Sequence, residues 1–261
     1  MDSTSLYDGF SAEGLAELIG AEHVHLLGAT SSTMDVAHEL ARDGAPAGTI
    51  VIADTQTAGR GRSGSKWVSE PGEGIWLTLI ERPVDPSALD VLSIRVGLGA
   101  ARALDLFSEE PVRIKWPNDL FSDGRKLGGI LIEARWRNTD LEWVAIGVGV
   151  NVRRPATVDA ASLEPGTTRV EVLAELFPEL RDAAQPVGQL DDGEMSEFDG
   201  RDFARGRYCT EPASGIVGGI SPSGELLVAL ADSVVKFRSG SLVMPGVPGR
   251  SSSPVQAPGT E

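Results

Sequence analysis

Cysteine, histidine and long apolar runs are scarce in this chain of 261 residues. Cys209 is its one cysteine, so no disulfide can close within the chain, and a lone thiol suits a reducing cytoplasm. The three histidines lack metal-ligand spacing, and no run of about 18 apolar residues is present to cross a membrane. The first ten residues lack the basic stretch of a secretory signal. These absences predict a cytoplasmic protein without a disulfide, a histidine metal centre or a membrane contact.

Positive charge is also scarce, with 23 Lys and Arg against 38 Asp and Glu and a net charge of −15. This balance argues against general nucleic-acid binding and favours solubility. At 41% hydrophobic residues the chain can bury an ordinary core, so we do not expect disorder. The length suits one large domain and a small one. Of the four lysines, Lys66, Lys115 and Lys126 fall within two short motifs.

The first motif is the basic loop Gly59–Trp67, with the sequence Gly-Arg-Gly-Arg-Ser-Gly-Ser-Lys-Trp. Glycines let a backbone approach a ligand closely and adopt positive φ. Arg60 and Arg62 provide charged forks that suit phosphate or carboxylate oxygens, and Trp67 offers a flat apolar face. The loop alone is equally compatible with an exposed, solvated basic turn.

The second motif lies in residues 112–134. The alternating run Val112–Trp116 predicts a strand that ends at Pro117, which has no N–H for a strand ladder. Asp123-Gly124 is a two-residue hairpin signal, and Ile130–Glu133 resembles the return strand. We therefore expect one hairpin that carries four polar residues near its turn: Lys115, Asn118, Asp119 and Lys126.

The third motif, Ala145–Asn151, is an apolar strand with glycine at every second position up to Gly149. Those glycines leave one face of the strand bare. Either a neighbouring element or a ligand packs closely against it.

Together, in this order and spacing, the motifs resemble those of the biotin–protein ligases, over roughly residues 25 to 245. The matching segments are Gly59–Trp67, Lys115–Asp119, Arg125–Glu133 and Gly147–Asn151. Ser31-Ser32-Thr33 and Gln56 match two further biotin-site positions. One departure is Met34, where the family usually has Asn, and this puts one polar contact to biotin in doubt.

The resemblance implies an ATP-dependent enzyme that makes biotinyl-5′-AMP from biotin and MgATP. The enzyme then transfers biotin to a lysine of a biotin carboxyl carrier domain of a biotin-dependent carboxylase. It implies an α/β (α+β) fold, a mixed β-sheet with helices packed on it, of the class II synthetase-like, biotin-lipoyl ligase type. A small SH3-like C-terminal barrel follows. The expected boundaries are 1–200 for the catalytic domain, 205–245 for the barrel and 246–261 for a disordered tail.

The resemblance also implies roles for individual residues. The expected catalytic residues are Lys126, Arg60, Arg62, Lys115 and Asp119, with Asp119 also a contact for Mg²⁺. The expected biotin-binding residues are Ser32, Thr33, Gln56, Gly59, Arg60, Gly61, Arg62, Lys126, Gly128 and Gly129. The expected ATP- or adenylate-binding residues are Arg60, Arg62, Trp67, Asn118, Lys126 and Asn151.

The remaining periodicity predicts the elements between the motifs. Helices are expected over 12–19, 34–42, 87–107 and 168–181, and strands over 23–27, 50–54, 75–80, 226–230 and 234–238. Residues 184–202 are rich in acidic side chains and poor in apolar spacing, which predicts a linker or a loose surface helix.

Two other functions remain open. A lipoate- or octanoate-transferring enzyme shares the fold, although the arginine-rich loop and Lys-Trp-Pro-Asn-Asp favour biotin. A biotin-responsive DNA-binding repressor is a different class. The roughly 25 residues before the first strand are acidic, and they lack Lys and Arg, so we expect a short form without a DNA-binding domain and no nucleic-acid partner. The chain is expected to be a monomer or a homodimer.

Overall fold

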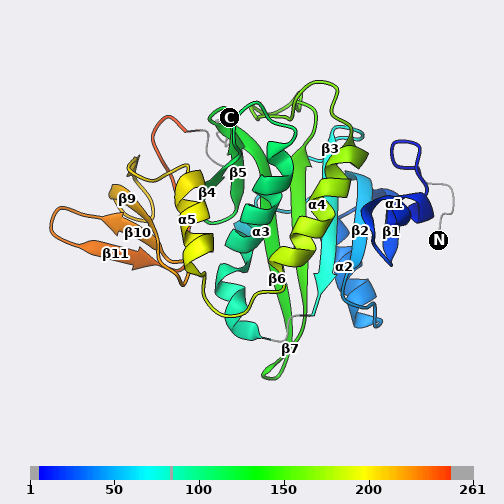
Figure 1. Ribbon diagram of the computed structural model, residues 1–261, viewed down its shortest axis with the longest axis horizontal. Coiled ribbons are helices and arrows are strands. Elements are labelled where there is room, and N and C mark those ends of the chain that lie inside the picture. The colour runs from blue at the N-terminus through cyan, green and yellow to red at the C-terminus, as the bar shows by residue number, and fades with distance from the viewer. Residues whose placement is uncertain (1–5, 83–84, 248–261) are drawn as a thin grey trace, which may run out of the picture.

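The central feature is a seven-stranded sheet in the order β1-β2-β3-β7-β6-β5-β4 (Figure 1). The structure is a computed structural model that describes residues 6–82 and 85–247. β1 and β2 run parallel and the other neighbours are antiparallel, which confirms the predicted mixed sheet. The strands are β1 (Val24–Thr30), β2 (Thr49–Gln56), β3 (Gly74–Glu81), β4 (Arg113–Lys115), β5 (Asp119–Ser122), β6 (Arg125–Arg137) and β7 (Asp140–Asn151).

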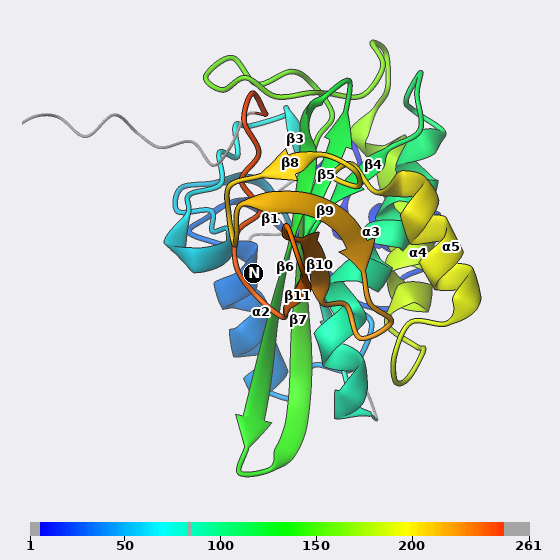
Figure 2. The same cartoon turned by 90° about the vertical axis from the view of Figure 1, so that its left-hand side faces the viewer.

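Helices cover both faces of this sheet (Figure 2). α2 packs against β2, β3 and β7 on one face, while α3 and α4 pack on the other. The helices are α1 (Ala12–Ile19), α2 (Thr33–Arg42), α3 (Leu89–Asp105), α4 (Arg169–Ala183) and α5 (Asp192–Arg201), with 3-10 turns η1 (Arg62–Gly64) and η2 (Pro86–Ala88). None of the helices in the described part of the chain is both long and apolar enough to span a bilayer.

Capping residues fix the helix ends near where the sequence predicts them. The Ser11 side chain accepts from Gly14 N–H at the start of α1, and Gly20 ends that helix at φ 70°. Ser32 caps α2 by accepting from Met34 N–H. The main core lies between the sheet and the α3–α4 layer, and a smaller core lies between α2 and the opposite face of β2, β3 and β7.

Of the two predictions for the acidic segment 184–202, the helix is confirmed over Asp192–Arg201, although it is packed rather than loose. Asp191 and Glu194 form a capping box, in which each side chain accepts from the other's backbone N–H. Glu194 also pairs with buried Arg95 at 2.6 Å, and Phe198 is fully buried. The acidic residues thus start α5 and attach it to α3.

The predicted single hairpin of residues 112–134 is wrong in one respect. β4 and β6 do not pair, because β5 lies between them. The turn at Asp123-Gly124 joins β5 to β6, whereas Asn118 lies at the tight turn between β4 and β5. The apolar pair Leu120-Phe121 is the middle of β5, a four-residue strand that is too short for alternation to reveal.

The C-terminal part is a four-stranded antiparallel sheet of order β11-β10-β9-β8. Its strands are β8 (Tyr208–Cys209), β9 (Gly215–Ile220), β10 (Leu226–Ala229) and β11 (Val234–Phe237). Strand pairing among the described residues does not close this small all-β unit into a ring, and Val243 joins it by one bridge to Glu211. Trp116 Nε1 donates to the Gly224 carbonyl at 2.9 Å and ties the unit to the main sheet. The predicted boundaries at 200, 205 and 245 stay predictions, and 248–261 of the predicted tail lies outside the described residues.

Candidate active site

A row of aligned residues crosses the sheet on the face that carries α2. The register pairs Lys115 with Asp119, Asp119 with Gly129, Gly129 with Gly149, and Gly149 with Trp76. Directly paired residues project to the same face of a sheet. The row therefore has two charged side chains at one end, bare backbone in the centre and an indole at the other end.

The basic loop folds back on itself beside this row. Trp67 N–H donates to the Gly59 carbonyl at 2.9 Å, and Gly61 N–H donates to the Ser65 carbonyl at 2.7 Å. A Cβ on Gly59 would lie 2.6 Å from the Trp67 carbonyl oxygen, so only glycine fits there. Ser63 and Gly64 turn the loop at φ 53° and 74°. The two ends of the loop are thus held together by backbone hydrogen bonds, and Ser65 Oγ adds a bond to the Arg62 carbonyl at 2.9 Å.

Trp67 lies on the bare backbone at the centre of the row. A Cβ on Gly149 would lie 2.6 Å from Trp67 Cε2, and one on Gly129 would lie 3.0 Å from Cζ3. The indole meets Trp76 edge-on, with 6.2 Å between ring centroids. Its Nε1 is buried and has no hydrogen-bond partner among the described residues. Trp76 Nε1 is also buried without a described partner, and a water molecule or a ligand acceptor would satisfy either donor.

Met34, the departure from the family pattern, packs on the same bare surface of the sheet. A Cβ on Gly147 would lie 2.8 Å from Met34 Cε, and Met34 is 3% exposed. The alternating glycines of β7 are thus covered by two apolar side chains, Met34 and Trp67. The structure therefore confirms close packing against these glycines, and a ligand site on the same surface stays a prediction.

Lys126 reaches the charged end of the row. Its Nζ lies 2.6 Å from Asp119 Oδ1 and 5.0 Å from the centroid of the Trp67 ring. Lys115 is 7% exposed, with Nζ 5.7 Å from the centroid of Phe121. Lys126 is therefore next to both the Trp67 indole and the bare backbone of the row, while the Lys115 side chain is more deeply buried.

Arg62 and Asn118 meet at the neighbouring turn. Arg62 Nη1 donates to Asn118 Oδ1 at 3.3 Å, and Asn118 Nδ2 donates to the Ile130 carbonyl at 2.6 Å. The turn before β5 is therefore fixed to β6, and it holds the amide oxygen toward the basic loop.

Arg60 is held by carboxylates that sequence reasoning did not assign to the site. Its Nη2 lies 2.8 Å from Asp35 Oδ1 on α2 and 3.7 Å from Glu133 Oε1 on β6. His38 Nε2 lies 2.9 Å from Glu133 Oε2, and Trp143 Nε1 donates to His38 Nδ1 at 2.9 Å. Since Nδ1 accepts, the proton of a neutral His38 is on Nε2 and is donated to Glu133. Of these partners, only Glu133 could have been linked to the site from the sequence, because it lies at the end of a matching motif.

The predicted biotin-binding polar residues form a connected cluster. Thr33 N–H and Oγ1–H both donate to Gln56 Oε1, at 2.9 and 3.2 Å, and Gln56 Nε2 donates to Ser69 Oγ at 2.9 Å. A Cβ on Gly59 would lie 3.2 Å from Gln56 Nε2, which places this cluster against the start of the basic loop. Ser32 uses its hydroxyl to cap α2.

Asn151 lies at the end of β7, and its side chain is linked through Ala161 to the backbone of Lys126. Its Nδ2 donates to the Ala161 carbonyl at 3.2 Å, and Ala161 N–H donates to the Lys126 carbonyl at 2.9 Å. Among the described residues, no hydrogen bond joins Asn151 to the indole of the basic loop. Its assignment to the adenine base stays a prediction.

The structure thus brings most of the predicted residues to one face of one sheet. In the described residues, no group of three or more His, Cys, Asp and Glu side chains could hold a metal ion. A single carboxylate, Asp119, next to a lysine is a poor resident metal site, so any Mg²⁺ here would arrive with a phosphate ligand.

Comparison with known proteins shows what the chain is similar to. Residues 26–151 match the model of the Biotin/lipoate A/B protein ligase family. Within it, the chain resembles the biotin protein ligases. It is 39% identical over 142 residues to the bifunctional ligase/repressor BirA of Bacillus spizizenii, covering 54% of this chain and 44% of that protein. It is 38% identical over 146 residues to the biotin–[acetyl-CoA-carboxylase] ligase of Paracoccus denitrificans, covering 55% and 59%.

The alignments span about half the length of these relatives. A solved structure covers more of the chain: the biotin protein ligase from Aquifex aeolicus in complex with biotin and ATP. It has a TM-score of 0.71 at 24% identity and covers 85% of this chain and 99% of that one. The likeness shows that the two chains share a fold, and it confirms the predicted fold class.

Proposed function

We propose that this chain is an ATP-dependent biotin–protein ligase that acts in the cytoplasm. The biotin carboxylate attacks the α-phosphorus of MgATP, which gives biotinyl-5′-AMP and pyrophosphate. The amine of a carrier lysine then attacks the acyl carbon of this mixed anhydride, loses its proton and releases AMP. The acceptor is a biotin carboxyl carrier domain of a biotin-dependent carboxylase.

One observation carries the proposal: Lys126 and the indole of the basic loop meet over bare backbone at the centre of the sheet. Bare strands accommodate a flat ligand, and the indole is suited to cover it. Lys126, Arg60 and Arg62 provide the cations required where carboxylate and phosphate oxygens come together. The comparisons support biotin as the substrate, because the relatives are named as biotin ligases.

The other assigned residues have supporting roles. Thr33 and Gln56 offer donors and acceptors to the polar head of biotin, next to Gly59. Asp119, released from Lys126, is placed to hold the incoming amine, while Asn118 fixes that turn. The division into a catalytic part (1–200) and a small C-terminal part (205–245) belongs to the same proposal.

The test combines the purified protein with MgATP, biotin and a carrier domain of acetyl-CoA carboxylase. Intact-mass spectrometry of the carrier should show the addition of one biotin. Parallel reactions with lipoate and octanoate, at the same concentration, test the alternative that the protein is a lipoate- or octanoate-transferring enzyme of the same fold. Modification by lipoate or octanoate in preference to biotin would refute the assignment of biotin.

A further inference from the structure

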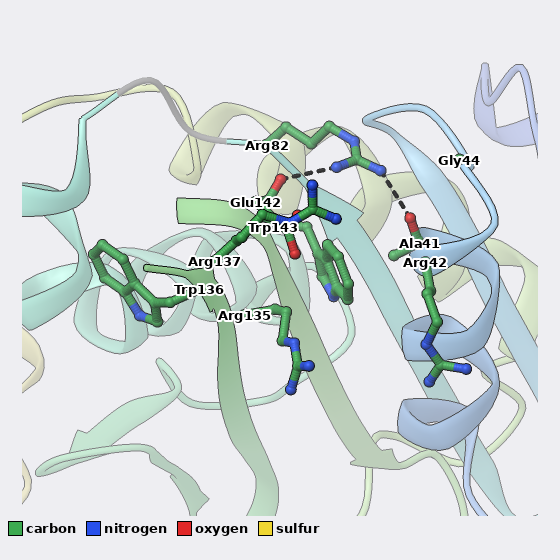
Figure 3. A pocket seen from close by; sticks show the side chains of 9 residues that line it. All are labelled: Ala41, Arg42, Gly44, Arg82, Arg135, Trp136, Arg137, Glu142 and Trp143. Carbon is green, nitrogen blue, oxygen red and sulfur yellow. Dashed lines mark hydrogen bonds and ion pairs between the residues drawn. The ribbon is translucent and has the colours of Figure 1, made fainter. Parts of the chain in front are cut away.

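A groove rich in arginine lies at the far end of the β6–β7 hairpin, away from the candidate site. It has a volume of about 570 Å³, and its lining includes Arg42, Arg82, Arg135, Arg137, Trp136 and Trp143. Figure 3 shows Arg42 on α2, Arg135 and Trp136 at the end of β6, and Trp143 between them. We call this set of six residues the arginine groove. Four arginines in one groove are unexpected in a chain of net charge −15.

Three of these arginines have no carboxylate partner in the described part of the chain. Arg82 donates to the carbonyls of Glu142, Ala41 and Ala45, which fix its side chain without neutralising its charge. Arg42 and Arg135 are exposed, and neither forms an ion pair with any residue in 6–82 or 85–247.

The fourth arginine is compensated. Arg137 pairs with Glu142 at 2.9 Å, and Glu142 is the one acidic residue in the lining of the groove. The arginine groove therefore keeps an excess of positive charge on an otherwise acidic molecule.

The groove shares a face of the sheet with the candidate site. Residues two apart on a strand project to the same side, so Gly129, Glu133 and Arg135 face together. The bulge in β6 comes after Arg135 and leaves that alternation intact. Six residues of strand separate Gly129 from Arg135, a distance of about 20 Å. A folded domain of about 100 residues, with a radius of gyration of about 13 Å, is wide enough to contact both places at once.

We propose that the arginine groove docks an acidic patch of the protein substrate while its lysine reaches the candidate site. This inference rests on the proposed function, because it takes the acceptor lysine to be carried by a folded protein. Guanidinium forks match carboxylate pairs, and Trp136 adds an exposed indole of the kind enriched at binding hot spots. A long nucleic acid would extend over the acidic remainder of the surface, whereas a compact acidic patch meets the groove alone.

The test reverses the two exposed charges in a double variant, Arg42→Glu with Arg135→Glu. The matched control is Arg205→Glu with Arg238→Glu, which changes net charge equally at exposed positions of the C-terminal part. We expect the KM for the acetyl-CoA carboxylase carrier domain to rise about tenfold or more in the groove variant, with kcat little changed. The same KM should rise with salt in the wild type and lose that dependence in the variant.

Two measurements separate this proposal from the proposed function. Pyrophosphate release and transfer of biotin to free hydroxylamine need no docking, and both should be equal in all three proteins.

Calorimetric titration with a glutamate homopeptide tests the groove without any catalysis. Binding by the wild type and the control, with loss in the groove variant, supports the docking site even if the protein proves inactive toward biotin. An unchanged carrier KM in the groove variant, or binding of oligothymidylate in place of the glutamate peptide, would overturn it.

Discussion

Replacing Lys126 with glutamine should separate catalysis from stability. The side chains of its ion pair with Asp119 are 36% and 23% exposed, so the pair contributes about 0–1 kcal/mol to stability. The ammonium lies 5.0 Å from the Trp67 ring centroid, a contact that contributes about 0.5–1 kcal/mol. The free energy of unfolding of Lys126→Gln should therefore fall by no more than about 2 kcal/mol.

The catalytic effect should be larger. Loss of one preorganised charge against the transition state costs about 2.7–4 kcal/mol, or a factor of about 100–1,000 in rate. The assay is pyrophosphate release with biotin and MgATP, alongside urea unfolding of the same preparations. Lys236→Gln is the control, because Lys236 is an exposed lysine on β11. A folded Lys126→Gln protein that releases pyrophosphate at a near-normal rate would refute the assignment, and one that does not fold would refute the energetic reasoning.

Three further outcomes follow from the contacts. Gly149→Ala should push the indole off the sheet and raise the KM for biotin about tenfold, whereas Gly218→Ala, whose Cβ would meet its nearest neighbours at 3.6 Å, should not. Asp35→Asn removes the resting partner of Arg60, so the KM for MgATP should fall by up to about fivefold, and a rise would contradict this. Burial raises the pKa of Asp202 above its ordinary value of 3.8, so ionisation costs stability as pH rises above that value. Urea unfolding should show Asp202→Asn gaining stability relative to wild type as the pH rises above 3.8, and a flat difference would count against this.

The sequence predicts much of the fold, because its signals there are local. Helix caps such as Ser11 and the apolar run of β3 depend on neighbouring residues, and both elements lie where expected. The short strand β5 was missed because its four residues are too few for a period. Helix α5 was expected only as a linker or a loose surface helix, because composition cannot show that its acidic residues act as caps and as partners of distant Arg95.

The candidate site was predictable only as far as its motifs. The motifs name Arg60, Lys126 and Trp67, but the partners of Arg60 come from α2 and from the far part of β6. The four arginines of the groove come from three separate regions of the chain, so no window of sequence brings them together. Net charge alone would have predicted no basic surface here. The pairing of β3 and β6 with β7, together with the packing of α2 on β7, assembles one.

Each cation beside the bare backbone already has a partner from its own chain. Lys126 is on Asp119, Arg62 on an amide oxygen and Arg60 on Asp35. An anion that binds here must therefore displace these partners, because each of the three cations already makes a contact within the protein. A small ion such as phosphate replaces one partner at a time and gains little from each exchange. A long anion, with oxygens spaced to meet all three cations at once, gains from every exchange in a single binding event. Selectivity at this face should thus follow the length of the anion more than its total charge.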